Sequence, residues 1–513
     1  MKIKDIYLGE VDAKNELLKQ KRTGEGFFIS SFSMPKQIDV GEYISGQKYF
    51  IYGLKGAGKT SLLRYIHDVL LKDNRGSEII LFKSHVSEED RQGLSKGAGF
   101  QILSTDGVPS FAQDFKESWK WMIYQKIAGA LEERKFQGVD VENLCTLTGV
   151  SEGGISSSLG ALFSKISSGK LRLSGEALGI AVELGIEGER EADSISVSPA
   201  NANRICAKLL NNIDFGRGFY LLFDELELVH NTQDQFDRDR RILRDLIYVI
   251  SQINAESAEN CRALFLISTL RSEVLHSILE LGHEIGKEVD DFGDKIDWSD
   301  AKDGPDHPLL TLIGKKISTS PEVSKDEVWS RFFPVKINNQ EYFKFILRSS
   351  YYRPRDIVRL LRVARNFNGQ SEKFTTAHFD ETALEFSRQT WLEITEELLA
   401  TYTPQQIEAI QKFFLGFNTL FFKSSIQARL AVRYQNDKLV SDLFRSKGVD
   451  RILADLYRIG VVGNNFMVEN QFGSSQRRDR WIFRGNTTLN DTERMAIHKS
   501  LWKHLSLVPG IAQ

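Results

Sequence analysis

The stretch YFIYGLKGAGKTSLLRYIHDVLL, residues 49–71, decides the fold class of this chain. A short apolar run ends at Gly53, a loop of small residues follows, and a regular helical pattern begins near Lys59. The loop has the spacing G-x-x-x-x-G-K-[ST], in which glycines let the backbone curl until several N–H groups point at a phosphate. The stretch therefore predicts a phosphate-binding loop between a strand and a helix.

The flanks of this loop favour a phosphate site over a chance match to the spacing. An apolar strand precedes it, and apolar residues recur from Leu62 to Leu70 on one face of the following helix, as packing on a sheet requires. Lys59 would place its charge on the β- and γ-phosphates, and the Thr60 hydroxyl would bind Mg²⁺. The residues expected to hold the nucleotide are Gly53, Leu54, Lys55, Gly56, Ala57, Gly58, Lys59, Thr60 and Ser61.

Short apolar runs alternate with longer helical patterns from Tyr49 to about Thr269, which is typical of a parallel sheet covered by helices. The chain is therefore expected to be an α/β protein whose core is the parallel sheet of a P-loop NTPase. The expected strands are residues 49–52, 78–83, 219–223 and 263–269.

The third of these strands ends in two adjacent carboxylates. Asp224 would coordinate Mg²⁺ directly or through water, and Glu225 would orient and polarise the attacking water, since adjacent residues at a strand end point to different sides. A helix N-cap with an acidic first turn is the structural alternative, and Glu227 is a possible substitute for Glu225. Coupled to the phosphate loop, the pair indicates nucleotide hydrolysis. No NKxD-type guanine motif follows a strand, which favours ATP over GTP.

The next strand ends in LISTLRSEVL, residues 266–275. Ser268 or Thr269 would sense the γ-phosphate there, and Arg271 could stabilise charge in the transition state. Ordinary capping chemistry is the alternative for the two hydroxyl side chains.

Arginines gather in two further places. Those of DRDRRILRD, residues 237–245, could reach the nucleotide of a neighbouring subunit, but a solvated helix face with Asp partners is the favoured interpretation. In YYRPRDIVRLL, Arg353 and Arg355 begin a later helix. An arginine in such a lid could touch the γ-phosphate, while a simple N-terminal turn with Pro354 is the alternative.

The rest of the chain predicts four regions. Residues 1–47 form a lead-in, 48–310 the sheet core, 311–402 a helical lid and 403–513 a winged-helix-like domain. Within the core, residues 151–198 are a Gly/Ser-rich insertion that reads either as a β-hairpin or assembly loop, from alternation such as GIAVELGIEGE, or as a disordered linker.

The last region begins with a strong helix-start signal. In TPQQIEAIQKFFLG, Thr403 is the expected N-cap, Pro404 the first helical residue and Gln406 the partner in a capping box. A hairpin with arms NFMVEN and DRWIFRG and a final helix ERMAIHKSLWKHL complete the expected winged helix. Such a domain would contact DNA near its hairpin or would dock a protein; the basic residues there are Arg477, Arg478, Arg480 and Arg484.

Composition limits the possible partners. The 513 residues carry a net charge of −2, so any nucleic-acid site must be a local patch. The three cysteines form no CxxC pair, which argues against a zinc knuckle or disulfide framework and fits a reducing cytosol. The charged N-terminus is unlike a signal peptide, and no apolar run reaches the roughly twenty residues of a membrane span. A soluble, cytoplasmic protein without a membrane partner is expected.

These segments together resemble prokaryotic AAA-like P-loop ATPases related to the KAP and STAND NTPases, which are often encoded in defence or mobile loci. The resemblance covers residues 5–400 and is carried by YLGEVDAKNELL, FIYGLKGAGKTSLL, YLLFDELE, LISTLRSEVL, DKIDWSD and YYRPRDIVRLL. It implies that Asp224 and Glu225 are the Walker B pair, that Arg355 is a second sensor and that a winged-helix-like tail follows. The glycine-rich insertion departs from a minimal AAA core.

Two classes of function fit these features. In the first, the chain is a regulatory ATPase that uses ATP and Mg²⁺ and acts as a homo-oligomeric switch, in anti-phage defence by resemblance, with a separate effector protein. In the second, it is a DNA-binding module or assembly scaffold that uses ATP as a structural cofactor. The first class is favoured by the predicted catalytic residues, which are Lys59, Glu225, Arg271 and Arg355. Asp224 and Thr269 would also bind the nucleotide. Thr60 and Asp224 would be the ligands of the metal ion.

Overall fold

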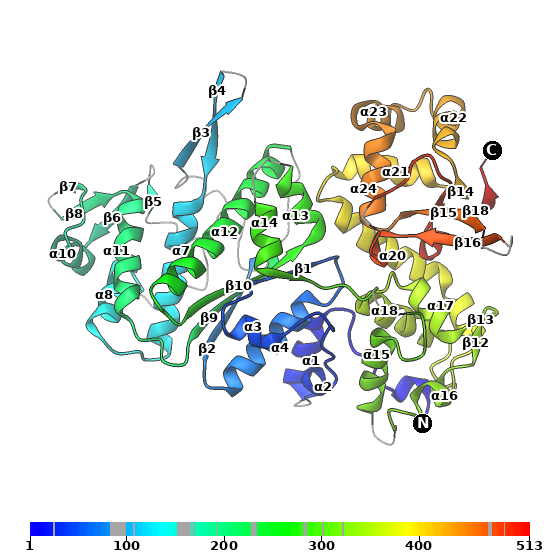
Figure 1. Cartoon of the computed structure of the whole chain (residues 1–513), viewed down its shortest axis with the longest axis horizontal. Coiled ribbons are helices and arrows are strands. Elements are labelled where there is room, and N and C mark those ends of the chain that lie inside the picture. The colour runs from blue at the N-terminus through cyan, green and yellow to red at the C-terminus, as the bar shows by residue number, and fades with distance from the viewer. Residues whose placement is uncertain are drawn as a thin grey trace. The chain divides into compact units, whose positions relative to one another are not determined.

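The structure, a computed structural model, describes residues 1–23, 26–82, 99–105, 108–150, 166–167, 170–191, 193–226, 233–280, 285–299, 302–320, 323–469, 475–486 and 488–512. The chain divides into two compact units. One consists of residues 1–38, 53–62 and 295–513, and the other of residues 39–52 and 63–294. Figure 1 labels their helices and strands.

A five-stranded sheet with the order β11-β1-β10-β9-β2 is the centre of the second unit. Strand β9 pairs in parallel with both β2 and β10, as the alternating sequence pattern predicted. Nearly every residue of β9 is buried, because a central parallel strand is covered on both faces. The strands are β1 (Phe50–Gly53), β2 (Gly76–Leu81), β9 (Phe219–Leu226), β10 (Leu264–Arg271) and β11 (Gly293–Lys295).

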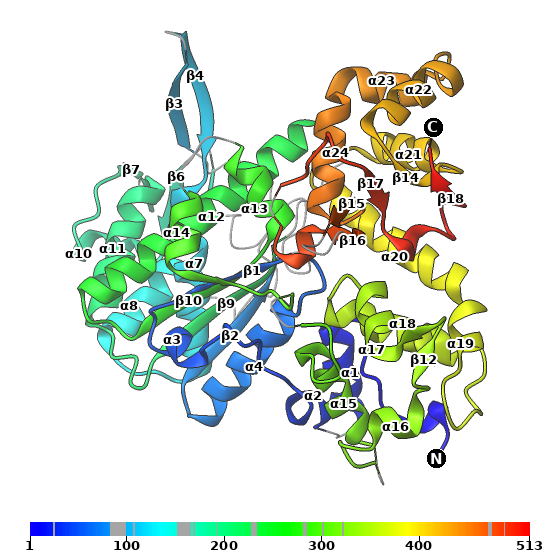
Figure 2. The ribbon, with the colours of Figure 1, turned by 45° about the vertical axis from the view of Figure 1, so that its right-hand side comes forward.

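Helices cover this sheet on both faces. Figures 1 and 2 show α12, α13 and α14 on one face and α3 and α4 on the other. Helix α4 begins directly after the phosphate loop, and its Leu62, Leu63, Ile66 and Leu70 are buried, which confirms the predicted apolar face. The helices are α3 (Val40–Ile44), α4 (Lys59–Lys72), α12 (Gln233–Glu259), α13 (Ser272–Leu279) and α14 (Ile285–Asp291).

Between β2 and β9 the chain forms additional elements. A hairpin of β3 (Gly99–Thr105) and β4 (Val108–Asp114) is followed by α7 (Lys116–Glu133), α8 (Val139–Thr148) and, later, α11 (Pro199–Asn212). A four-stranded sheet with the order β5-β6-β8-β7 lies between α8 and α11 in the sequence. Its elements are β5 (Ile166–Ser167), β6 (Lys170–Ser174), α10 (Glu176–Glu183), β7 (Glu189–Glu191) and β8 (Ser194–Val197).

The predicted insertion at residues 151–198 is thus partly resolved into structure. Residues 151–165, 168–169 and 192 lie outside the described part of the chain. The described residues of the insertion contain an antiparallel sheet and a helix, and so do not form a linker without secondary structure. The expectation of strand-like alternation in GIAVELG was wrong, because Glu176–Glu183 is a helix. Ala177 and Ala181, one helical turn apart, are its buried residues.

The first unit begins with the lead-in, which forms η1 (Ile3–Asp5), α1 (Ala13–Thr23) and α2 (Phe27–Ser30). The lead-in is fixed to the helical region by ion pairs of Glu10 with Arg362 and of Glu16 with Lys316, both at 2.6 Å. The helical region consists of α15 (Pro308–Ser318), α16 (Val328–Phe332), β12 (Lys336–Ile337), β13 (Gln340–Glu341), α17 (Tyr342–Ser349), α18 (Pro354–Arg365), α19 (Thr376–Asp380) and α20 (Ala383–Leu398).

The C-terminal region confirms the helix-start signal. Thr403 is the N-cap of α21, its side chain accepts a hydrogen bond from the Gln406 N–H, and the Thr403 N–H donates to Gln406 Oε1 at 3.0 Å. The helices and strands are α21 (Pro404–Phe414), β14 (Asn418–Phe421), α22 (Lys423–Arg433), α23 (Lys438–Lys447), α24 (Val449–Arg458), β15 (Val462–Glu469), β16 (Ser475–Arg480), η2 (Ile482–Arg484), β17 (Met495–Ile497), η3 (Lys499–Leu501) and β18 (Val508–Ile511).

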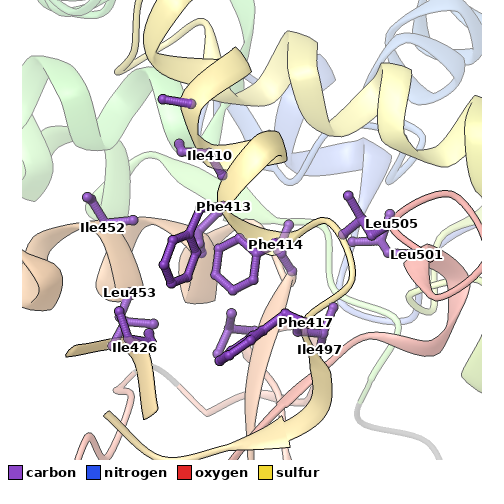
Figure 3. Packing of buried hydrophobic residues seen from close by; sticks show 14 of the residues in the cluster. Ile410, Phe413, Phe414, Phe417, Ile426, Ile452, Leu453, Ile497, Leu501 and Leu505 are labelled. Carbon is purple, nitrogen blue, oxygen red and sulfur yellow. The ribbon is translucent and has the colours of Figure 1, made fainter. Parts of the chain in front are cut away.

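Phenylalanines of α21 and the following turn form the centre of the C-terminal core. Figure 3 shows Phe413, Phe414 and Phe417 packed among apolar side chains of α24 and of the segment around η3. The Phe413 and Phe414 rings meet edge to face with centroids 5.1 Å apart, a favourable aromatic geometry. This core joins the helices to a sheet with the order β16-β15-β17-β14-β18.

Two expectations for this region were wrong. The final helix predicted at residues 493–505 is instead β17 and the short η3, because Met495–Ile497 is buried on both faces between β15 and β14. The hairpin exists, but its second arm is Ser475–Arg480, and Ile482–Arg484 is a turn of 3₁₀ helix. Within the described residues, every helix is too short or too polar to span a membrane.

Candidate functional site

The GLKGAGKTS loop has the backbone geometry that its sequence predicted. It leaves β1 at Gly53 and enters α4 at Lys59. Gly56 and Gly58 have φ values of +79° and +105°, in the left-handed region that only glycine adopts readily. A Cβ added to Gly58 would meet no described atom within 4 Å. The loop therefore has a curled backbone, and no atom of the described residues crowds the position beside Gly58, which fits a phosphate group.

Lys59 is folded onto the loop itself. Its ammonium donates hydrogen bonds to the carbonyl oxygens of Gly53 and Leu54, each at 2.9 Å. Both acceptors are backbone groups of the residues that precede the curl, so the lysine ties the two ends of the loop together. Thr60 is the second residue of α4, in the first helical turn, where backbone N–H groups have no partner within the helix.

The segment DKIDW, residues 294–298, contacts the phosphate loop at Gly53 and Ala57. The indole Nε1–H of Trp298 donates to the Ala57 carbonyl oxygen at 2.9 Å, and Trp298 is buried. A Cβ added to Gly53 would lie 3.0 Å from the carbonyl oxygen of Ile296, so a larger residue at this position would be crowded against that carbonyl. The sequence marked DKIDW only as a shared motif; its contacts give it a structural role in shaping the loop.

Arg355 lies against the loop from the start of α18. Its backbone N–H points to the Gly56 carbonyl oxygen at 3.4 Å, and a Cβ on Gly56 would come within 3.1 Å of the Arg355 Cβ. The guanidinium donates to the Val11 carbonyl oxygen at 3.2 Å, to Asp12 at 3.4 Å and to Glu393 at 3.2 Å. Of the two predicted lid arginines, this one is brought to the loop.

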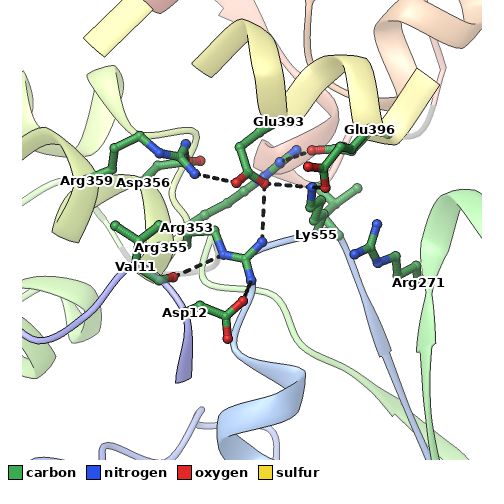
Figure 4. A network of polar contacts seen from close by, with 12 residues as sticks. Val11, Asp12, Lys55, Arg271, Arg353, Arg355, Asp356, Arg359, Glu393 and Glu396 are labelled. Atoms are coloured by element: carbon green, nitrogen blue, oxygen red, sulfur yellow. Dashed lines mark hydrogen bonds and ion pairs between the residues drawn. The ribbon is translucent and has the colours of Figure 1, made fainter. Parts of the chain in front are cut away.

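Lys55 is held by two carboxylates of α20, as Figure 4 shows. The Lys55 ammonium lies 2.8 Å from Glu393 and also forms an ion pair with Glu396. The lysine side chain is only 4% exposed. Glu393 in turn forms ion pairs with Arg355 at 3.2 Å and with Arg359 at 2.8 Å. Burial alone would raise the pKa of Glu393, but these cations lower it to about 2.

Sequence reasoning missed Glu393 and Glu396. A signal was available, because the EITEE segment of α20 places carboxylates at i, i+3 and i+4, which are neighbours on one helix face. Nothing in the sequence pairs that face with a loop more than three hundred residues earlier, in the way that Lys55 and Glu396 pair across 341 positions.

Arg353 has a different environment from Arg355. Its guanidinium donates to Glu397 at 2.6 Å and to the carbonyl oxygen of Ile459 at 3.3 Å, and both charged side chains are buried. Burial alone would lower the pKa of Arg353, but the carboxylates of Glu397 and Asp356 raise it above its usual value. Arg353 thus connects the start of α18 to α20 and to the end of α24.

The acidic strand end belongs to the second unit, and two predicted residues meet there. The Thr269 hydroxyl donates to Asp224 Oδ1 at 2.6 Å, and Asp224 is 2% exposed. Their strands β9 and β10 are parallel neighbours, so the carboxyl ends lie at one edge of the sheet. The other predicted candidate, Ser268, is fully buried and bonds through its backbone N–H to the Tyr49 carbonyl oxygen.

Glu225 has an unusual backbone conformation. Its φ is +59°, a left-handed value that costs a residue with a Cβ roughly 1–2 kcal/mol. The register of β9 against β10 shifts at this point, between the pairs Phe223–Ser268 and Leu226–Leu270. Such strain at a strand end is often found at functional sites. Glu227, the predicted substitute, lies outside the described residues.

Four of the five arginines predicted for a nucleotide role in the second unit have acidic partners. Arg271, at the end of β10, lies 3.7 Å from Glu273. In α12 the ion pairs are Arg238–Asp239 at 2.8 Å, Arg240–Asp237 at 3.7 Å and Arg244–Asp245 at 2.7 Å. These pairs agree with the predicted Asp partners, but the expectation of a solvated face was wrong, because the side chains of Arg238, Arg240 and Arg244 are only 15%, 11% and 5% exposed. No described ion pair involves Arg241.

The predicted basic patch of the C-terminal region is smaller than its sequence indicated. Arg478 and Arg480 are exposed on β16, and Arg480 lies over the Phe466 ring with 5.5 Å to the centroid. Arg484 instead donates to Asp303 at 3.0 Å and stacks over Tyr352. The side chain of Arg477 lies outside the described part.

The helical region matches a known protein family. Residues 307–395 match a family described as the FunZ-associated C-terminal helical domain. The matched region runs from the start of α15 into α20 and includes Arg355 and Glu393, but not the phosphate loop. No curated protein matches the chain.

Proposed function

We propose that this chain is a P-loop ATPase that binds ATP with Mg²⁺, hydrolyses it, and acts as a regulatory switch. The observation that carries the proposal is the strand–loop–helix of residues 50–72, in which Gly56 and Gly58 have positive φ and α4 begins at Lys59. A curled loop of backbone N–H groups at a helix N-terminus is a ready site for phosphate.

Each proposed residue has a role that follows from its chemistry. Lys59 exchanges its two carbonyl acceptors for the β- and γ-phosphate oxygens, and Thr60 supplies a hydroxyl ligand to Mg²⁺. Asp224 is the second metal group, held in place by the Thr269 hydroxyl. Glu225 orients the attacking water, and Arg271 offers positive charge to the transition state. Thr60 and Asp224 would hold the metal, which when bound would supply positive charge to the phosphate groups.

The switch function is supported by the segment YYRPR, residues 351–355. Its last residue, Arg355, contacts the phosphate loop, whereas Tyr351 stacks on His498 with ring centroids 3.8 Å apart. Tyr351 and Tyr352 both have left-handed φ values, +52° and +53°, which are costly for tyrosine. A strained segment with one end on the loop and the other in the C-terminal region can report the state of the loop.

Steady-state ATPase assays on the full chain, with and without duplex DNA, test this proposal. We expect Mg²⁺-dependent turnover that is lost in Lys59→Ala and strongly reduced in Glu225→Gln. The control is Glu385→Gln, an exposed carboxylate of α20 that is paired with Arg388 and has no proposed role. Tight ATP binding without turnover, unchanged by Glu225→Gln, would contradict the enzyme proposal and favour ATP as a structural cofactor.

DNA binding is the second candidate, favoured by the exposed arginines of β16. Loss of duplex binding in Arg478→Ala/Arg480→Ala, but not in the control Arg388→Ala, would support it. DNA that stimulates turnover would join the two candidates into one DNA-coupled switch. On the resemblance alone, we propose that the chain forms a homo-oligomer, acts with a separate effector protein and serves in anti-phage defence. Measuring the size of the protein with and without ATP tests the homo-oligomer.

A further inference from the structure

The phosphate loop contains a second lysine, and its side chain is not exposed to solvent. Lys55, at the third position of the loop, is buried and contacts both Glu393 and Glu396. Bringing an ammonium out of water is costly unless its charge is well compensated. Two carboxylates on successive turns of α20 provide that compensation, so Lys55 is bound to α20 and its charge is neutralised there.

The same helix holds the second cation beside the loop. Glu393 accepts from Arg355, whose own backbone and Cβ lie on Gly56. Glu393 is also paired with Arg359, which keeps its carboxylate in place, and Arg359 has a further partner in Asp356 at 2.7 Å. One acidic helix face therefore holds the positive charges on both sides of the Gly56 curl.

A triphosphate placed on this loop would compete with that face. Its oxygens carry the same sign of charge as Glu393 and Glu396. Lys55 belongs to the loop and Arg355 contacts it, and both cations are paired with those carboxylates. Resting on the proposed function, we propose that Glu393 and Glu396 are an acidic clamp on the phosphate loop, which opposes nucleotide binding and is released when nucleotide phosphates attract Lys55 and Arg355.

Release of the clamp would also change contacts outside the phosphate loop. The next residue of α20, Glu397, bonds to Arg353, which also donates to Ile459 at the end of α24. A shift of this turn of α20 therefore changes contacts of the C-terminal region. Because coupling between two sites is reciprocal, whatever holds α20 in the clamped position also weakens nucleotide binding.

Titration of a fluorescent ATP analogue with Mg²⁺ into the full chain tests the clamp. Wild type, Glu396→Gln, Glu393→Gln/Glu396→Gln and the matched control Glu385→Gln are compared. We expect the double variant to bind at least about fivefold more tightly, the lower end of typical coupling, and Glu396→Gln to bind tighter by less. Glu385→Gln removes one negative charge from the same helix, so unchanged affinity there excludes a general charge effect. Glu396 is 54% exposed, so its variant serves if the double variant fails to fold.

Hydrogen exchange of residues 393–400 gives an independent readout. We expect ATP to increase exchange there in wild type and to leave the double variant unchanged. If wild type binds ATP but the variants bind no more tightly, or α20 exchange does not respond, the clamp is wrong while the proposed function stands. Binding by the double variant alone would support a strong clamp. Binding by none of the proteins overturns the proposed function, and the clamp with it.

Discussion

Helix α20 carries two ion pairs that differ in burial but not in length, and they give a quantitative prediction. Glu397 and Arg353 lie 2.6 Å apart with side chains 0% and 6% exposed, whereas Glu385 and Arg388 lie 2.7 Å apart with side chains 45% and 50% exposed. Glu397→Gln would remove the negative charge that Arg353 contacts and leave this buried cation with neutral acceptors, such as the Ile459 carbonyl oxygen, and the carboxylate of Asp356. Removing one partner of a buried pair costs about 3–5 kcal/mol. Glu385→Gln should have no measurable effect, because exposed pairs add little.

Urea unfolding followed by circular dichroism measures both changes in one protein. The double variant Arg353→Met/Glu397→Leu removes both charges and should be more stable than Glu397→Gln, since two apolar side chains leave no unpaired charge. Equal midpoints for Glu397→Gln and Glu385→Gln would refute the buried pair. So would strictly additive effects of the two substitutions in the double variant.

Four further outcomes are expected. Trp298→Phe removes the donor to Ala57 and should cost about 1–3 kcal/mol in thermal unfolding, with faster exchange of the loop amides. Gly56→Ala introduces a Cβ at φ +79°, so ATP binding should fall while circular dichroism stays native. Thr269→Val should lower turnover more than ATP affinity, measured by paired kinetics and titration. Because the pKa of Glu393 is lowered to about 2, its stabilisation is complete above its ordinary value near 4.5 and is lost as the pH falls toward 2. Acid titration of unfolding should show this loss in wild type but not in Glu393→Gln.

The local parts of the fold could be predicted from sequence because neighbouring residues determine them. The curl at Gly56 follows from the glycine spacing, and the capping box at Thr403 follows from residues three apart. The hydrogen bond of Thr269 to Asp224 was foreseeable too, because parallel strands bring their carboxyl ends to one edge. In each case the sequence separation is short or the sheet topology supplies the contact.

Non-local packing accounts for the failures. Met495–Ile497 has helix-compatible residues, but its place between two strands of a sheet makes it a strand. Propensity is a weak prior that such a tertiary environment overrides. The Lys55–Glu396 pair was unpredictable for the same reason, since either residue alone reads as an ordinary surface charge. The contact between such a glutamate and the loop can be recognised only when the position of its helix is known.

Calorimetric titration of Mg²⁺–ATP into the full chain, alongside Lys59→Ala, tests the proposed phosphate site most directly. We predict one ATP bound per chain in wild type and loss of that binding in a Lys59→Ala variant with native circular dichroism. No binding to wild type, or equal binding by the two proteins, would contradict the assignment of GLKGAGKTS as an ATP site.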